Sequence, residues 1–188
     1  MQALETQLID RASRGEEAAF HQLVDQNAAY LFRAAYGLLG SRADAEDVVQ
    51  ETFLAAYRSL AKFAGRSSLR TWLMSILINQ AALIRRKRKG VLRLAADFEH
   101  EDVRGAPLTS AVDARIDVAR MLADLSAEYR EVLVLRECQG LSYQEIAQAL
   151  HIPAGTVESR LFRARQELRK RFGDLGSDTD SKPDRKLS

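Results

Sequence analysis

Apolar residues recur along most of the chain at intervals of three and four, the spacing that gathers them on one face of an α-helix. No stretch shows the sustained alternation of a strand, so the sequence predicts an all-α fold. The expected helices cover residues 16–39, 44–60, 69–89, 114–125, 126–139, 142–150 and 154–171. Gly40 is placed to end the first helix and Asp44 to cap the second. The buried face of that second helix includes Val48, Phe53 and Tyr57.

The helical pattern lapses between residues 90 and 113 and again after residue 173. The first interval contains Gly90, Gly105, Pro107 and a cluster of acids, and the second is mostly polar and charged, which is typical of disorder. We therefore expect two small helical domains joined by a flexible linker. The predicted parts are residues 1–90 for the first domain, 91–113 for the linker, 114–173 for the second domain and 174–188 for a disordered tail.

The second domain contains the pattern of a helix-turn-helix between residues 141 and 171, as in winged-helix-like or four-helix domains. Ser142 and Glu145 are spaced as a capping box, in which each side chain bonds the backbone N–H of the other residue. The predicted turn covers residues 151–153. The helix after it has an inward apolar stripe, which consists of Val157, Leu161, Ala164 and Leu168.

The opposite face of that second helix is polar and basic. It presents Thr156, Glu158, Ser159, Arg160, Phe162 and Arg163. The N-terminal residues of such a helix approach base edges in the major groove, where arginine suits guanine or phosphate. The alternative is an ordinary helical hairpin with a solvated basic face. The capping box, the short turn and the basic second helix together favour DNA binding.

The formal net charge of +2 conceals blocks of opposite sign. Residues 85–89 form an unbroken basic run and four acids lie between residues 97 and 102, which indicates separate surfaces with separate partners. The single Cys138 excludes an intramolecular disulfide and a cysteine-based zinc site, and the three histidines are scattered, so we expect no metal and no cofactor. A polar N-terminus, and the lack of an apolar span of about 18 residues, favour a cytoplasmic location.

Four segments resemble a bacterial RNA polymerase sigma factor. Residues 44–53 (DAEDVVQETF) and 63–73 (FAGRSSLRTWL) resemble region 2 of that family, and residues 140–147 (GLSYQEIA) and 155–165 (GTVESRLFRAR) resemble region 4. A chain with only these regions and a short linker is similar to the extracytoplasmic-function (ECF) group of the sigma-70 family. The resemblance implies a non-catalytic subunit that binds the β′ clamp helices and the β flap of core RNA polymerase. It also implies recognition of −10 and −35 promoter elements, DNA melting, an anti-sigma factor as partner, and no small-molecule substrate.

The resemblance assigns roles to residues of the first domain. The polymerase-binding surface would consist of Asp44, Asp47, Gln50 and Glu51. Acids are also favoured at a helix N-terminus in any protein, so a solvated helix end is the alternative. The −10 surface would consist of Phe63, Gly65, Ser67, Ser68, Asn79, Arg85 and Arg86. In this surface the loop of small residues would offer backbone N–H donors to an unpaired base, and the basic run 85–89 would bind phosphate. Trp72 could stack on DNA, but it lies at helical spacing with Leu73 and Ile76, so we predict that it belongs to the core.

Three residues depart from the family pattern. His151 stands in the turn where glycine is usual, Glu158 replaces a residue that is commonly basic, and Arg66 is basic where an acid is frequent. A carboxylate that faces DNA repels phosphate but can accept a hydrogen bond from a cytosine amino group. The sequence therefore leaves the base preferences at both promoter elements open.

Two other functions compete with this interpretation. A stand-alone regulator with the same helix-turn-helix leaves the region 2 motif unexplained and requires an effector domain that the sequence does not show. An enzyme acting on nucleic acid would need Mg²⁺, but Asp44, Glu46 and Asp47 lie at one helix start with no second group of ligands. The linker acids either occupy a nucleic-acid channel of the polymerase or are simply solvated.

Overall fold

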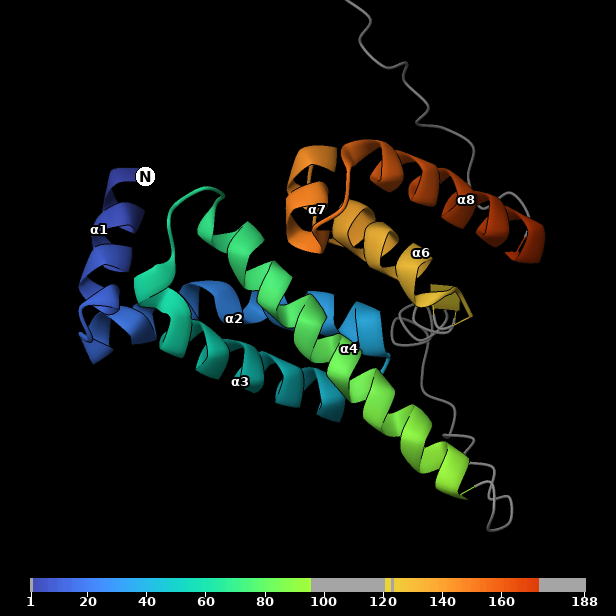
Figure 1. The fold of residues 1–188 in the computed structure, drawn as a ribbon, viewed down its shortest axis with the longest axis horizontal. Helices are drawn as coiled ribbons and strands as arrows, with labels where there is room; N and C mark the ends of the chain where they lie inside the picture. The colour runs from blue at the N-terminus through green and yellow to red at the C-terminus, as the bar shows by residue number, and fades with distance from the viewer. Residues whose placement is uncertain (1, 96–120, 123, 173–188) are drawn as a thin grey trace, which may run out of the picture.

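The computed structural model describes residues 2–95, 121–122 and 124–172. Within these ranges the chain is helical and has no strand, which confirms the all-α prediction (Figure 1). The elements are α1 (Gln2–Ser13), α2 (Glu17–Leu39), α3 (Arg42–Ser59), the 3₁₀ turn η1 (Leu60–Lys62), α4 (Leu69–Ala95), α6 (Ala127–Leu133), the π-helical turn η2 (Val134–Cys138), α7 (Tyr143–Leu150) and α8 (Ala154–Phe172). The predicted tail, and the predicted linker apart from residues 91–95, lie outside the described residues.

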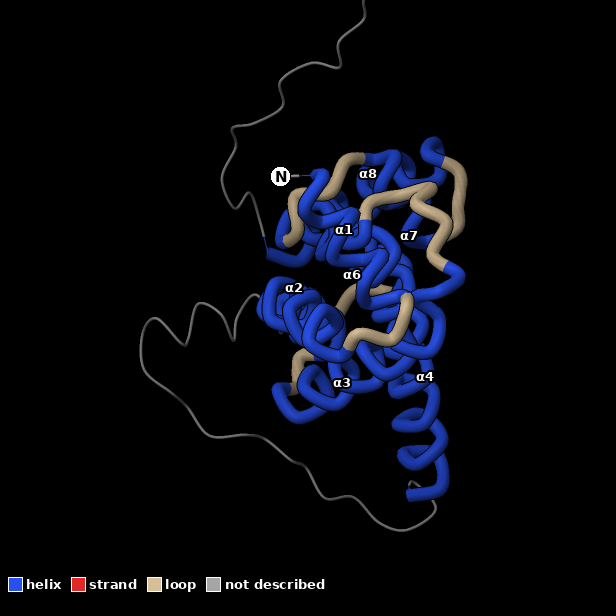
Figure 2. The backbone as a smooth tube through the Cα atoms, turned by 90° about the vertical axis from the view of Figure 1, so that its left-hand side faces the viewer, coloured by secondary structure: helices blue, strands red, loops and turns tan. Residues whose placement is uncertain are grey.

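Helices α1 to α4 form an N-terminal bundle, in which α2, α3 and α4 pack against one another and α1 lies against α2. The core is built from the apolar faces that the sequence predicts. Its fully buried side chains include Leu31 and Leu38 of α2, Val48 of α3, and Met74 and Leu77 of α4. Full burial of a side chain of this size contributes roughly 1.5–3 kcal/mol. The last turns of α4 stand clear of the other helices (Figure 2).

The start of α3 corrects the sequence prediction. The N-cap residue is Ser41, whose hydroxyl accepts from the backbone N–H of Asp44 at 3.4 Å, and Asp44 itself lies inside the helix. The cause is Gly40, which ends α2 as predicted in a left-handed conformation (φ 67°) and donates its N–H to the carbonyl of Tyr36. One extended residue then suffices to begin the next helix.

Two other helix boundaries differ from the prediction. Helix α4 continues through Gly90 to Ala95, because a single interior glycine costs only about 1 kcal/mol among good helix formers. The sequence does not predict α1. This helix is short, and Leu8 and Ala12 are the buried residues of its narrow apolar face.

The C-terminal bundle, made of α6, η2, α7 and α8, contains the predicted helix-turn-helix. Glu145 donates its N–H to the Ser142 hydroxyl at 3.3 Å, and its carboxylate accepts from the Ser142 N–H at 2.9 Å, so the capping box is confirmed. His151 takes the left-handed conformation (φ 54°) that the turn requires. The predicted inward stripe of α8 is also present, with Val157, Leu161 and Ala164 buried and Leu168 partly buried.

A π-helical turn replaces the second half of the helix predicted over residues 126–139. There the N–H of Gln139 donates to the carbonyl of Val134, five residues back, at 3.1 Å. Four consecutive residues, 132–135, are buried, because this segment lies against α2 on one side and against α7 and α8 on another. Burial of four consecutive residues requires packing on more than one face of the helix, which the pattern of a single apolar face does not predict.

The two bundles pack against each other, α4 on α7 and α2 on η2. A Cβ atom added to Gly37 of α2 would lie 3.1 Å from Cγ2 of Val134, so the contact is tight at this point. Nearby, Nη2 of Arg85 lies 2.5 Å from Oε1 of Glu131, and both side chains are largely buried, at 19% and 13% exposure. The sequence, which shows two domains and a linker, does not predict this contact.

Candidate polymerase-binding and DNA-binding surfaces

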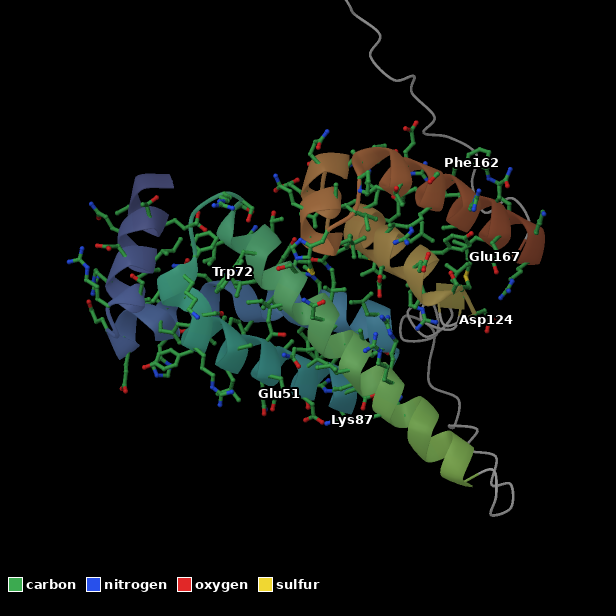
Figure 3. The ribbon with its side chains drawn as sticks, in the orientation of Figure 1. Glu51, Trp72, Lys87, Asp124, Phe162 and Glu167 are labelled. Carbon is green, nitrogen blue, oxygen red and sulfur yellow. The ribbon has the colours of Figure 1, made fainter. Side chains whose placement is uncertain are left out.

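Helix α3 buries one face and exposes an acidic one. Ala45, Val48 and Thr52 are fully buried, whereas Asp47, Gln50 and Glu51 are exposed and lie at helical spacing on the other side. In Figure 3, Glu51 points away from the bundle. Among the described residues neither Asp47 nor Glu51 has an ion-pair partner. We call Asp47, Gln50 and Glu51 the acidic stripe.

Asp44, predicted to belong to the same surface, lies in a different environment. Its Oδ2 atom is 2.5 Å from Nη2 of Arg88 on α4, and its side chain is only 16% exposed. The structure therefore does not group Asp44 with the acidic stripe. Instead, the ion pair between Asp44 and Arg88 connects the first turn of α3 to α4.

Two apolar residues extend the exposed side of α3. Leu54 and Tyr57 are each 48% exposed. The sequence prediction that Tyr57 is buried is wrong, although one edge of its ring packs on Phe20 with centroids 4.9 Å apart. Both residues continue the spacing of the acidic stripe, which is the sequence signal for them. An apolar patch beside two unpaired acids is typical of a protein-binding surface.

The loop between η1 and α4 is held at both ends and open in the middle. At its end the Ser68 hydroxyl caps α4 by accepting from the N–H of Thr71 at 3.1 Å. In its middle Gly65 takes the left-handed conformation (φ 64°), and no atom would lie within 4 Å of an added Cβ. Ser67 donates its hydroxyl to the carbonyl of Ser68 at 3.3 Å. The predicted small-residue loop is thus present, with Ser68 engaged in the helix cap.

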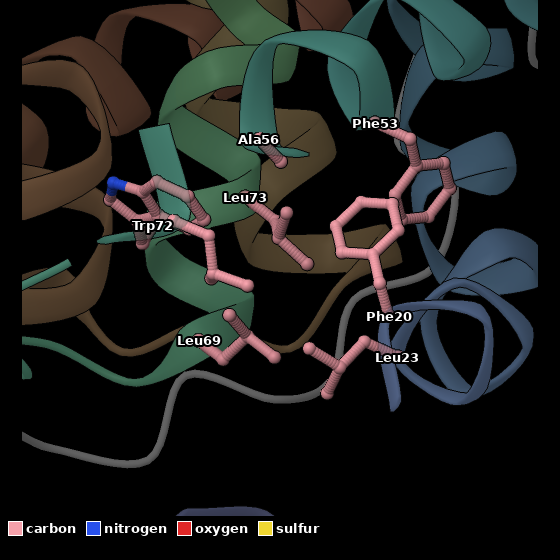
Figure 4. A pocket seen from close by; sticks show the side chains of 8 residues that line it. Phe20, Leu23, Phe53, Ala56, Leu69, Trp72 and Leu73 are labelled. Atoms are coloured by element: carbon pink, nitrogen blue, oxygen red, sulfur yellow. The ribbon is translucent and has the colours of Figure 1, made fainter. Parts of the chain in front are cut away.

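Trp72 packs against the core, as predicted. Its ring lies against that of Phe63, with centroids 5.1 Å apart, and is partly buried. Figure 4 shows Trp72 beside Leu69 and Leu73 at one end of a small apolar cavity. The cavity has a volume of about 10 Å³, which is room for one water at most and excludes a nucleobase.

A polar groove borders the same loop on its other side and was not predicted. It has a volume of about 610 Å³ and runs between α1 and α2 to Ser68 and Arg70. Amide side chains of α2, those of Gln22, Gln26 and Asn27, line it. The sequence offers no signal for this groove, because α1 itself was not predicted.

Helix α4 divides the predicted −10 residues into exposed and engaged groups. Asn79 and Arg86 are exposed. Arg85 is held by Glu131 of the other bundle, and Arg88 by Asp44. Among the described residues, the basic run therefore offers solvent the side chains of Arg86 and Lys87, which have no ion-pair partner there.

The outward face of α8 is mixed in charge. Glu158, Ser159, Phe162 and Arg163 are exposed, with Phe162 at 61% (Figure 3). Thr156 and Arg160 are half-buried. Nη2 of Arg160 lies 2.9 Å from Oε2 of Glu128 on α6, and Arg165 pairs with Glu137 at 2.8 Å. In the described part of the chain, the first half of this face therefore leaves the Glu158 carboxylate, the Arg163 guanidinium and the Phe162 ring without partners.

Comparison with known proteins decides the family. Residues 23–91 match the family described as Sigma-70 region 2, and residues 115–168 match Sigma-70, region 4. The RNA polymerase sigma-H factor of Pseudomonas aeruginosa is 35% identical, over 93% of this chain and 96% of that protein. The ECF RNA polymerase sigma-E factor of Haemophilus influenzae is 36% identical, over 89% of this chain and 95% of that protein. The chain belongs to the ECF group of the sigma-70 family.

The fold of this sigma factor is also that of a solved relative, RpoE of Bartonella quintana in complex with the anti-sigma factor NepR. That structure is 29% identical, with a TM-score of 0.70, over 84% of this chain and 98% of the other.

This sigma factor therefore binds core RNA polymerase and directs it to promoters. The region 2 match removes the alternative of a stand-alone regulator, which has no such region. Sigma factors are not a family of catalytic enzymes. In the described part of the chain no cluster of three or more metal-ligating side chains occurs. No described helix combines the length and the apolar character that crossing a bilayer requires.

Proposed function

We propose that this sigma factor uses three separate exposed surfaces to bind core polymerase, the −10 element and the −35 element. The acidic stripe of α3 binds the β′ clamp helices of core polymerase, the 63–68 loop with α4 acts on the −10 element, and the outer face of α8 reads the −35 element. The C-terminal bundle also meets the β flap. Each surface presents groups that have no partner among the described residues, as an interface to other molecules requires.

The acidic stripe is the observation that carries the proposal. A helix that needed its acids only for its own stability would hold them in pairs one turn apart, as Glu46 is held by Arg42 at 2.8 Å. Asp47 and Glu51 have no such pairs among the described residues. Leu54 is exposed on the same face of α3, about one turn after Glu51, so a basic partner helix would find both charged and apolar contacts there. Asp44 supports this surface by fixing the first turn of α3 to α4.

The −10 surface combines an open loop with a basic helix. Backbone donors around Gly65 and the polar groove beside Ser68 offer room for an unpaired base of the non-template strand. Phe63 and Ser67 frame the loop, and Asn79, exposed on α4, reaches the DNA from the side. Arg86 and Lys87 bind phosphate. Arg85 takes part in this only when its pair with Glu131 opens.

We further propose that an anti-sigma factor restrains this protein in the cytoplasm, where it meets the polymerase. The solved relative from Bartonella quintana supports this, because it was captured with such a partner. The exposed side of α3 is the surface we expect the partner to cover, since covering the acidic stripe would prevent polymerase binding directly.

Substituting Gly65→Val is expected to impair melting and spare polymerase binding. A β-branched residue at positive φ costs about 1–3 kcal/mol, which displaces the open loop and lowers the permanganate reactivity of unpaired −10 thymines at least about fivefold. The matched control is Ala64→Val, an exposed neighbour whose φ is not positive. Equal reactivity in the two variants would remove the loop from the −10 surface.

A further inference from the structure

We propose that Glu158 makes this sigma factor select a cytosine in its upstream promoter element, by accepting a hydrogen bond from the cytosine N4 amino group in the major groove. This inference rests on the proposed docking of α8 and specifies what that helix reads. It concerns a carboxylate at a position where a DNA-binding helix would gain general affinity from a cation.

The position of Glu158 fits contact with a base edge. It is the fifth residue of α8, within the N-terminal part that approaches the bases in a helix-turn-helix. Its neighbours Val157 and Leu161 are buried in the core of the bundle, whereas the Glu158 side chain, about 100° round the helix from Val157, is exposed. The capping box of α7 and the left-handed turn at His151 fix how α8 is presented.

The carboxylate has no partner within the described part of the protein. The residues one turn away on α8, Ala154 and Phe162, carry no charge, so no pair along the helix forms. The nearest arginine in sequence, Arg160, is held by Glu128 of α6. Glu167 on the same helix shows the contrast, because its carboxylate accepts from Arg171 at 2.8 Å. Glu158 therefore approaches DNA with its charge unsatisfied.

The chemistry of the groove then selects the base. Phosphates repel a carboxylate, and guanine presents two acceptors and thymine one, so none of these can satisfy it. Adenine has an amino group, but its N7 acceptor lies beside it and repels a second carboxylate oxygen. Cytosine presents the amino group alone. A good contact of this kind discriminates between bases by about 5- to 150-fold.

Two exposed residues near Glu158 on α8 can contact other bases of the same element. Phe162, 61% exposed, can pack on a thymine methyl group, and Arg163 can bond guanine or phosphate. Glu158 lowers the affinity of α8 for every DNA sequence that lacks cytosine at the contacted position. It therefore discriminates against wrong sequences, whereas Arg163 contributes favourable binding.

The test uses holoenzyme assembled from core polymerase and the full chain, with an upstream element randomised in sequence and selected by promoter binding. The wild type should enrich cytosine about 5- to 150-fold at one position of one strand. Glu158→Arg should shift that position to guanine and leave the others unchanged. Glu158→Gln should shift it toward adenine, whose N6 and N7 suit an amide. Glu167→Gln is the matched control and should leave the motif as it is.

The outcomes separate this inference from the proposed function. If Phe162→Ala and Arg163→Ala alter the selected motif but both Glu158 variants leave it intact, Glu158 does not read a base and the inference fails alone. If Glu158→Gln instead binds all promoter sequences more tightly by the same factor, with no change in base preference, Glu158 only repels DNA. The inference then also fails. If none of these variants changes the motif, α8 does not read the upstream element and the proposed function fails as well.

Discussion

Replacing Asp47 and Glu51 together by lysine is expected to weaken binding of the full chain to core RNA polymerase by a factor of at least about 100. Placing like charges against each other across an interface costs several kcal/mol, and 1.4 kcal/mol corresponds to a factor of ten. Both carboxylates are exposed and unpaired in the described structure, so the substitutions break no internal contact that is seen there. The loss would therefore come from the interface and not from unfolding.

Competition binding with a fluorescently labelled sigma factor measures this effect. The matched control is the double variant Glu17→Lys and Asp25→Lys, which reverses two exposed acids of α2 in the same bundle that have no ion-pair partner among the described residues. It should bind core within about threefold of the wild type, since surface charges away from an interface change affinity little. Equal affinities of the two double variants would show that the acidic stripe is not the polymerase-binding surface.

Substituting Arg130→Met is expected to lower the free energy of unfolding by about 3 kcal/mol and the thermal midpoint by roughly 6–12 °C. The half-buried guanidinium donates to the carbonyls of Leu122 at 2.6 Å, Leu125 at 3.0 Å and Leu38 at 3.0 Å. Leu38 belongs to α2, so one side chain ties the end of that helix to the C-terminal bundle. Burial lowers the pKa of Arg130, but the group remains charged at neutral pH.

The free energy of unfolding falls because methionine fills part of the space but donates no hydrogen bond. The three carbonyl groups are then left without the donor that Arg130 supplied. Thermal unfolding of the full chain followed by circular dichroism gives the midpoint. Arg42→Met serves as control, since its ion pair with Glu46 is exposed and worth less than about 1 kcal/mol. A midpoint lowered by no more than that of the control would mean that Arg130 does not join the bundles.

The helix-turn-helix could be predicted closely because its determinants are local. The capping box joins Ser142 and Glu145, which are three positions apart, and the apolar stripe of α8 repeats within one helix. Both patterns are written in adjacent parts of the sequence, so elementary helix geometry is enough to interpret them. The exposed face of α8 followed from the same geometry, since the residues opposite a buried stripe must face solvent.

Long-range pairing could not be predicted in the same way. Asp44 is 44 positions from Arg88, and Arg85 is 46 positions from Glu131, so no local pattern marks either pair. As a result, two residues assigned to functional surfaces turn out to be tied to other helices of the fold. The burial of residues 132–135 has the same origin, because four consecutive buried residues reflect packing between bundles and not the periodicity of one helix.

Run-off transcription on a library of genomic fragments, with core polymerase alone, the purified chain alone and both together, tests the central claim most directly. We expect transcripts with defined start sites only when both are present, with shared motifs at the −10 and −35 positions, and weak binding of duplex DNA by the chain alone. Tight and specific duplex binding by the chain alone, with no effect on initiation by core polymerase, would contradict the account.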